Sequence, residues 1–172
     1  MLQRWIDRIE AINIYTGLAV SWLTLLMVLS TFLIVVLRYL FDFGLIAMQE
    51  SVIYMHALIF LLGAAFTLQK DAHVRVDIFY QRLSARAQAK INLFGHIVFL
   101  APSMLFIFII SWQYVSESWQ VMETSREAGG LPGVFLLKTM ILLMAALMLL
   151  QAIAGSLRAI QTLQQNHSEH QR

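Results

Sequence analysis

The chain has 172 residues, of which 59% are hydrophobic and only 13% are charged. Soluble domains carry about 25% charged residues, so this composition excludes an ordinary water-exposed surface and favours a lipid bilayer as the solvent. The formal net charge of +2 argues against nucleic acid as a partner. The absence of cysteine excludes disulfides, thiolate metal sites and thiol nucleophiles.

Four segments have the length and composition of a membrane-spanning helix, which needs about 20 mostly apolar residues. They cover residues 14–37, 49–68, 91–115 and 134–157. The first apolar run exceeds the roughly 7–15 residues of a signal-peptide core, and we interpret it as a retained helix. The sequence therefore predicts an all-α integral membrane protein, a single domain with four transmembrane helices.

Lysine and arginine residues predict the orientation, because cytoplasmic flanks are enriched in them. One side of the membrane receives nine basic residues: Arg4, Arg8, Lys70, Arg75, Arg82, Arg86, Lys90, Arg158 and Arg172. The other side receives only Arg38, Arg126 and Lys138. Both termini are therefore expected in the cytoplasm, with residues 158–172 as a cytoplasmic tail.

Two amphipathic segments, residues 1–13 and 74–90, are expected to lie in the membrane interface. The second has an apolar stripe at helical spacing: Val76, Phe79, Tyr80, Leu83 and Ala87. Arg75, Arg82 and Arg86 border that stripe, which is typical of a helix in the headgroup plane. Such helices would fix the depth and tilt of the protein.

Polar residues inside a membrane are costly, so each one is a candidate for a functional role. Arg38 and Glu50 stand at the outer ends of the first two spans. An ion pair that locks this hairpin is expected, and the alternative is a charge that faces a substrate or partner. Gly63 belongs to a set of small residues on the second span, which packs within the bundle or docks another membrane protein.

The histidines raise the question of a metal or cofactor. His56 and His96 are expected roughly 12 Å apart in depth, too far to share one haem iron, and we interpret them as packing residues hydrogen-bonded between helices. His73 and Asp77 are four residues apart, but a metal site needs at least three protein ligands. We also find no nucleophile–base pair, phosphate loop or carboxylate dyad. The sequence predicts no metal, no cofactor and no enzymatic activity.

Two local signals concern the second half of the chain. The stretch Gly129-Gly130-Leu131-Pro132-Gly133 predicts a break before the last span, after an acidic outer loop over residues 116–133. Pro102 is a site where the third span can kink.

The second span and its exit carry a family resemblance. Gln49-Glu50-Ser51 opens the span, Gly63-Ala64-Ala65 lies near its end, and Lys70-Asp71-Ala72-His73-Val74-Arg75-Val76-Asp77 follows it. The outer loop Ser125-Arg126-Glu127-Ala128-Gly129-Gly130-Leu131-Pro132 adds to the likeness. With four spans in a chain of this length, the sequence resembles the small membrane subunit of tripartite ATP-independent periplasmic (TRAP) transporters, the DctQ-like family.

The resemblance implies a specific transport system in the bacterial cytoplasmic (inner) membrane. A periplasmic substrate-binding protein captures an organic acid, a carboxylate or sulfonate, and delivers it to one large (M) and one small membrane subunit. The large subunit moves the substrate with a sodium gradient, and the small subunit is a scaffold. Candidates for structural or subunit-interface roles are then Arg38, Glu50, His56, Gly63, His73 and Asp77. Candidates for docking the periplasmic protein are Glu123, Arg126 and Glu127.

The residues themselves favour this accessory role. Secondary transporters place their sites near mid-bilayer on broken helices of internal repeats, and this chain has neither a repeat nor a mid-bilayer carboxylate. One alternative is an autonomous four-helix transporter, which would be expected to carry a glutamate inside its first span. Another is the membrane anchor of a redox enzyme, which would need haem or quinone ligands. Membrane lipids are expected partners in every case.

Overall fold

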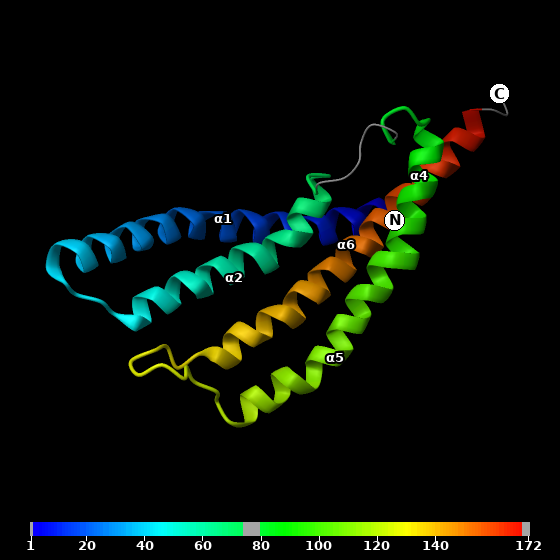
Figure 1. Ribbon diagram of the computed structural model, residues 1–172. Coiled ribbons are helices and arrows are strands. Elements are labelled where there is room, and N and C mark those ends of the chain that lie inside the picture. The colour runs from blue at the N-terminus through cyan, green and yellow to red at the C-terminus, as the bar shows by residue number, and fades with distance from the viewer. Residues whose placement is uncertain (1, 74–79, 170–172) are drawn as a thin grey trace.

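A computed structural model describes residues 2–73 and 80–169, and within these ranges all regular structure is helical. The elements in chain order are α1 (Leu2–Phe41), α2 (Ile46–Gln69), α4 (Ala85–Phe94), the π-helix η1 (Gly95–Leu100), α5 (Ala101–Gln120) and α6 (Val134–Glu169) (Figure 1). Four helical segments are long and apolar enough to cross a membrane: Gln3–Phe41, Ile46–Gln69, Ala85–Gln120 and Val134–Gln165. The prediction of an all-α protein with four such helices is confirmed.

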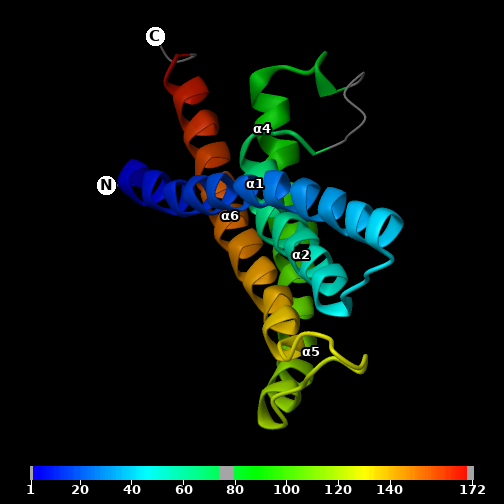
Figure 2. The same ribbon diagram turned by 90° about the vertical axis from the view of Figure 1, so that its left-hand side faces the viewer.

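Helix α6 is the centre of the bundle. It contacts α1, α2, α4, η1 and α5, while α1 packs mainly against α2. The α1–α2 and α5–α6 hairpins diverge toward their turns, and α1 crosses α6 near the N-terminus (Figures 1 and 2). The buried positions of α6 include Ala145, Ala152 and Ala154. Small side chains allow this central role because they let neighbouring backbones approach closely in a membrane.

A close contact of the same kind joins α1 and α2. Gly17 of α1 lies against the ring of Phe66 of α2, and a side chain at Gly17 would overlap that ring. Gly63, one turn before Phe66, faces the α1 residue Val20 with ordinary clearance. The small residues of the first hairpin therefore serve packing within the bundle.

The N-terminal segment differs from the expected separate interfacial helix over residues 1–13. Residues 2–13 are the first turns of α1, which continues without a break to Phe41. No glycine or proline precedes Gly17, so nothing in the sequence interrupts the helix. Its 40 residues extend about 60 Å, about twice the hydrocarbon thickness of a bilayer.

The connection before the third span also differs from the expected helix over residues 74–90. Residues 74–79, and with them Arg75, lie outside the described part of the chain. Helix α4 begins at Ala85, where Ser84 caps it by accepting a hydrogen bond from the Ala87 backbone N–H. The helix then continues through η1 into α5, so residues 85–90 are the first turns of the third span. Ser84 supplies a start signal, and no proline follows before Pro102.

The kink expected near Pro102 takes the form of the π-helix η1. Proline has no N–H and its ring clashes with the carbonyl four residues earlier. The wider turn accommodates this clash, and the Ala101 N–H bonds to the carbonyl of His96, five residues back. The predicted break before the last span is confirmed, because α5 ends at Gln120 and α6 begins at Val134. Gly129 has a φ of 81°, a conformation that favours glycine.

Candidate functional site

Glu50, near the start of α2, holds the loop between α5 and α6. Its Oε1 accepts a hydrogen bond from the Ser125 hydroxyl, and its Oε2 accepts one from the Leu131 backbone N–H at 2.6 Å. Ser125 and Leu131 also bond to each other through their backbones at 3.2 Å. We call Glu50, Ser125 and Leu131 the outer cluster. It fixes the loop onto a helix that lies about 80 residues earlier in the chain.

The predicted ion pair between Arg38 and Glu50 is wrong. Within residues 2–73 and 80–169, Glu50 makes no ion pair with Arg38, because both of its oxygens accept hydrogen bonds from the outer loop. Arg38 is exposed in the last turn of α1. A positive charge at that position interacts favourably with the helix C-terminus.

A second set of contacts ties α5 to α6 beside the loop. The Lys138 ammonium lies 2.5 Å from Glu123 Oε2 and 3.9 Å from the centre of the Tyr114 ring. The Ser118 hydroxyl donates to the same oxygen of Glu123 at 2.6 Å. The hydrogen bond from Lys138, followed by that from Ser118, holds the pKa of Glu123 below its ordinary value.

The Trp119 indole adds to this junction. Its N–H donates to the Thr139 hydroxyl at 2.8 Å, and its ring packs edge-on against Phe135 at 4.7 Å between centroids. The outer end of the bundle is thus fixed by an ion pair, hydrogen bonds and aromatic packing. Sequence analysis had not paired Lys138 with Glu123, although two opposite charges in the same outer loop region were a usable signal.

The three docking candidates now separate into two kinds. Glu123 is partly shielded and bound to Lys138, so it has a structural role in the loop. Arg126 and Glu127 are exposed, and the Glu127 backbone N–H bonds to the Ser125 hydroxyl. Their side chains stand on a loop whose backbone the outer cluster holds in place.

The opposite end of the bundle has an inner cluster, which consists of Glu10, Asn13, Gln151 and Arg158. The Asn13 amide donates to Gln151 Oε1 at 2.7 Å, and Arg158 forms an ion pair with Glu10. Asn13 is 1% exposed, Gln151 4% and Glu10 7%. These contacts attach the first turns of α1 to α6. Sequence analysis missed them, but isolated polar residues in apolar runs, such as Asn13 and Gln151, do require partners.

The remaining candidates have local roles. His56 is exposed on α2 and stacks on Phe60 at 6.2 Å. His96 packs against Gly155 of α6. Neither ring makes a hydrogen bond to another helix within the described residues, so the predicted hydrogen bonds between helices are wrong, although His96 does pack against α6. His73 Nε2 lies 3.2 Å from the Ala64 carbonyl, beyond the end of α2. Asp77 lies outside the described residues.

The described residues contain no group of three His, Cys, Asp or Glu side chains that could hold a metal ion. The polar contacts instead gather at the two ends of the spans. Charged residues are absent from residues 11–37, 51–69, 91–116 and 139–157. The arrangement can fix helices and a loop, but it offers no charged site at mid-bilayer.

A family model described as "Tripartite ATP-independent periplasmic transporters, DctQ component" matches residues 27–162. The chain belongs to the DctQ family. A similar curated protein is the "C4-dicarboxylate TRAP transporter small permease protein DctQ" of Vibrio cholerae serotype O1 (strain ATCC 39315 / El Tor Inaba N16961), with 29% identity over 127 residues. The alignment covers 73% of this chain and 53% of that relative, so the chain spans about half of the relative's length. No solved structure matches the chain.

Membership of the DctQ family makes the chain a component of a transporter and not an enzyme. The family match begins inside α1 and ends inside α6. It includes the whole outer cluster but not Glu10 and Asn13 of the inner cluster. The α1 half of the inner cluster therefore lies outside the matched region, while Gln151 and Arg158 of α6 lie inside it.

Proposed function

We propose that the chain is the small scaffold subunit of a TRAP-type secondary transporter, which supports a large transport subunit and does not itself carry the substrate. One observation carries this proposal: the four spans have no charged residue along their central stretches, and the charged groups sit near their ends. An organic anion that crosses a bilayer needs compensating charge or donors on its path. The path for an organic acid, with the sodium gradient as energy source, therefore lies in the large subunit.

The polar contacts support a stationary role. The inner cluster attaches α1 to α6, and the outer cluster attaches the α5–α6 loop to α2. Both link elements far apart in sequence, so the relative positions of the helices are fixed at both ends of the bundle. A subunit that holds a moving partner in the membrane needs this rigidity.

The outer loop supports a second part of the proposal, which is docking of a periplasmic substrate-binding protein. Arg126 and Glu127 present opposite charges on an anchored loop. An anchored loop loses less conformational entropy on binding than a mobile one. Arg38 and His56, which are exposed on α1 and α2, are available to the large subunit. In this arrangement the loop faces the periplasm of a bacterial cytoplasmic membrane and both termini face the cytoplasm.

Reconstitution tests the proposal. The chain should co-purify with the large membrane subunit of its transporter, and the pair with its periplasmic protein should take up an organic acid into vesicles under a sodium gradient. Vesicles that contain this chain alone should show no uptake. Uptake by the chain alone, or full activity of the large subunit without it, would refute the scaffold role.

The docking role has its own test with matched variants. Charge reversal at Arg126 or Glu127 should raise the concentration of periplasmic protein needed for half-maximal uptake and leave co-purification with the large subunit intact. Charge reversal at the exposed, remote Arg4 serves as the control. Equal effects of all three variants would contradict docking at the loop.

A further inference from the structure

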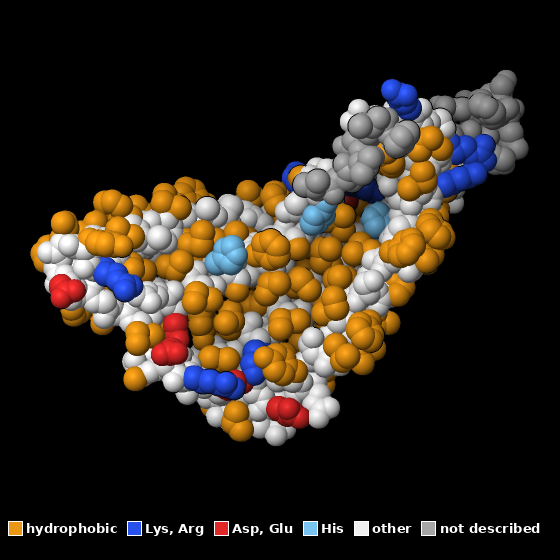
Figure 3. Space-filling model, viewed as in Figure 1, with side chains coloured by type: hydrophobic (Ala, Val, Ile, Leu, Met, Phe, Trp, Pro, Cys, Tyr) orange, Lys and Arg blue, Asp and Glu red, His pale blue; other side chains and the backbone are white. Residues whose placement is uncertain are grey.

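Three exposed basic residues stand at the start of the third span. They are Arg82 in the turn before α4, and Arg86 and Lys90 on α4. We call them the basic cluster. Lys and Arg side chains gather at this end of the molecule, and apolar side chains cover η1 and α5 beyond it (Figure 3). Lys90 is the last charged residue before the charge-free stretch 91–116, so in a membrane the basic cluster lies near the level of the lipid headgroups. The scaffold role does not use it.

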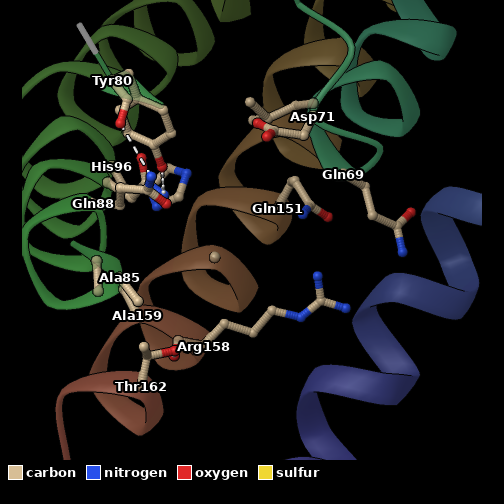
Figure 4. A pocket seen from close by; sticks show the side chains of 14 residues that line it. Gln69, Asp71, Tyr80, Ala85, Gln88, His96, Gln151, Arg158, Ala159 and Thr162 are labelled. Carbon is tan, nitrogen blue, oxygen red and sulfur yellow. Dashed lines mark hydrogen bonds between the residues drawn. The ribbon is translucent and has the colours of Figure 1, made fainter. Parts of the chain in front are cut away.

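Arg86 and Lys90 point away from a polar cavity that borders α4. The cavity has a volume of about 420 Å³ and lies between α2, α4 and α6, with Gln88 and Asn92 on its α4 wall (Figure 4). Arg86 and Lys90 each precede one of these two residues by two positions, which is about 200° of rotation in an α-helix. Their side chains therefore stand on the outer side of α4, where a membrane lipid has access to them.

The turn that carries Arg82 is held against α4. The Gln88 amide donates to the Tyr80 carbonyl at 3.0 Å and to the Leu83 carbonyl at 3.2 Å, and Figure 4 shows Gln88 beside Tyr80. The Ser84 hydroxyl accepts from the first turn of α4. These contacts fix the backbone on both sides of Arg82, so the turn loses little conformational entropy when the basic cluster binds a ligand.

The basic cluster has no counter-charge within the described residues. Its three side chains make no ion pair or hydrogen bond there. Of the carboxylates at this end of the bundle, Glu10 is paired with Arg158 and Asp71 also has a partner. Like charges four residues apart on a helix, such as Arg86 and Lys90, repel each other. An anion beside them removes this repulsion.

An apolar surface continues the outer side of the same helix. Phe94 follows Lys90 by four residues and therefore lies on the same side. Phe94, Ile97 and Val98 are exposed by 57%, 56% and 45%. Within the described residues, the most apolar stretch of this span has no buried residue. This surface can receive the acyl chains of a lipid whose headgroup lies at the basic cluster.

From these observations we propose that the basic cluster binds the phosphate of an anionic phospholipid, and that its acyl chains lie along Phe94, Ile97 and Val98. Arg86 and Lys90 contact the phosphate from the helix, and Arg82 adds N–H donors from the turn. A zwitterionic lipid offers the same phosphate, but its ammonium meets three positive charges and no free carboxylate. The bound lipid fixes the depth of this end of the third span in the membrane.

The first test compares lipids with identical acyl chains on the delipidated full chain in detergent. Phosphatidylglycerol should raise the melting temperature and remain bound in native mass spectrometry, with at least about tenfold higher affinity than phosphatidylcholine or phosphatidylethanolamine. This preference should shrink in about 1 M salt, which screens exposed charges. Equal binding of the zwitterionic lipids would overturn the proposal. An equal shift by soluble glycerophosphoglycerol would overturn the assignment to a lipid.

The complex with the large subunit provides a second test. Phosphatidylglycerol should stay bound to this chain when the complex forms. Its loss on assembly would show that the large subunit covers this side of α4, and it would overturn the assignment to a lipid.

Matched variants locate the site. The double variant Arg86→Gln/Lys90→Gln removes two charges and should lose at least about tenfold in affinity for phosphatidylglycerol. The control is Arg4→Gln/Arg8→Gln, which lowers the net charge equally at two exposed positions four residues apart on α1, but with Asp7 between them. The control should keep the preference for phosphatidylglycerol. An equal loss in both double variants would reduce the effect to net charge and overturn the proposal.

If Arg86→Gln/Lys90→Gln fails to fold, Arg82→Gln decides, because Arg82 is exposed and lies outside the helix. It should lose about fivefold in affinity for phosphatidylglycerol. Undiminished binding by folded Arg82→Gln would overturn the proposal.

Discussion

The hydrogen bond between Asn13 and Gln151 predicts that replacing Gln151 destabilises the protein more than replacing Asn13. The Asn13 amide donates to Gln151 Oε1 at 2.7 Å between residues that are 1% and 4% exposed. Asn13 Oδ1 already lacks a partner within the described residues. Asn13→Leu therefore removes one hydrogen bond and one unpaired oxygen, and it leaves one new unpaired oxygen on Gln151. The net loss is close to that of the hydrogen bond alone, about 0.5–1.5 kcal/mol of unfolding free energy.

Gln151→Met should cost more. It leaves both polar atoms of Asn13 buried without partners, so the cost of a newly unpaired buried donor, about 1–3 kcal/mol, applies in full. The double variant removes every unpaired group of this contact and should be nearly as stable as the parent. The double-mutant cycle should thus show a coupling close to the sum of the two single losses, about 1.5–4.5 kcal/mol.

The assay is reversible unfolding in mixed micelles, followed by helix content. The exposed Gln113, which donates to Glu117 one turn later, provides the matched control. Gln113→Met removes a hydrogen bond in the same way, but water replaces the lost partner, so the change should stay within about 0.5 kcal/mol. Additive effects at Asn13 and Gln151, or a Gln151→Met variant as stable as the parent, would refute the reasoning.

Three further predictions concern the outer loop and the orientation. Glu50→Gln keeps the size of the side chain but loses the charge that accepts from the loop, so proteolysis of residues 121–133 should become faster without loss of the helices. The pKa of Glu123 is lowered in the folded protein, so its contact with Lys138 stabilises the fold fully above the ordinary pKa of 4.5. This stabilisation is lost as the pH falls through the lower pKa of the folded state. Glu123→Gln should abolish this part of the acid sensitivity in an unfolding assay. The chain has no cysteine, so single cysteines can report the orientation. Glu127→Cys should react with an impermeant thiol reagent added from the periplasmic side, and Gln81→Cys should react only after the membrane is opened. The reverse pattern would overturn the predicted orientation.

The sequence predicted those features that depend on a short stretch of chain. The four spans follow from about 20 consecutive apolar residues each, and the break before α6 follows from Gly129 to Gly133. The π-helix before Pro102 has a local cause as well. The predicted interfacial helices were less accurate, since amphipathic spacing does not show whether a helix stops before the next apolar run. Residues 2–13 and 85–90 are continuous with spans.

The sequence did not show which polar residues would become hydrogen-bond partners. Glu50 was paired with Arg38 because both stand at neighbouring helix ends, but the structure brings Ser125 and Leu131 to it instead. Asn13 and Gln151 are 138 positions apart and gave no sign of each other.

The sequence by itself determined that this protein has four membrane-length helices, where they lie, and that their central stretches are free of charge. Only the tertiary structure decided which polar groups meet, because the spans are apolar on nearly all sides and the pattern does not show which face turns inward. Close contacts of small residues, such as Gly17 with Phe66 and Gly155 with His96, let neighbouring helices approach one another. In the packed bundle Glu50 meets the outer loop and Asn13 meets α6.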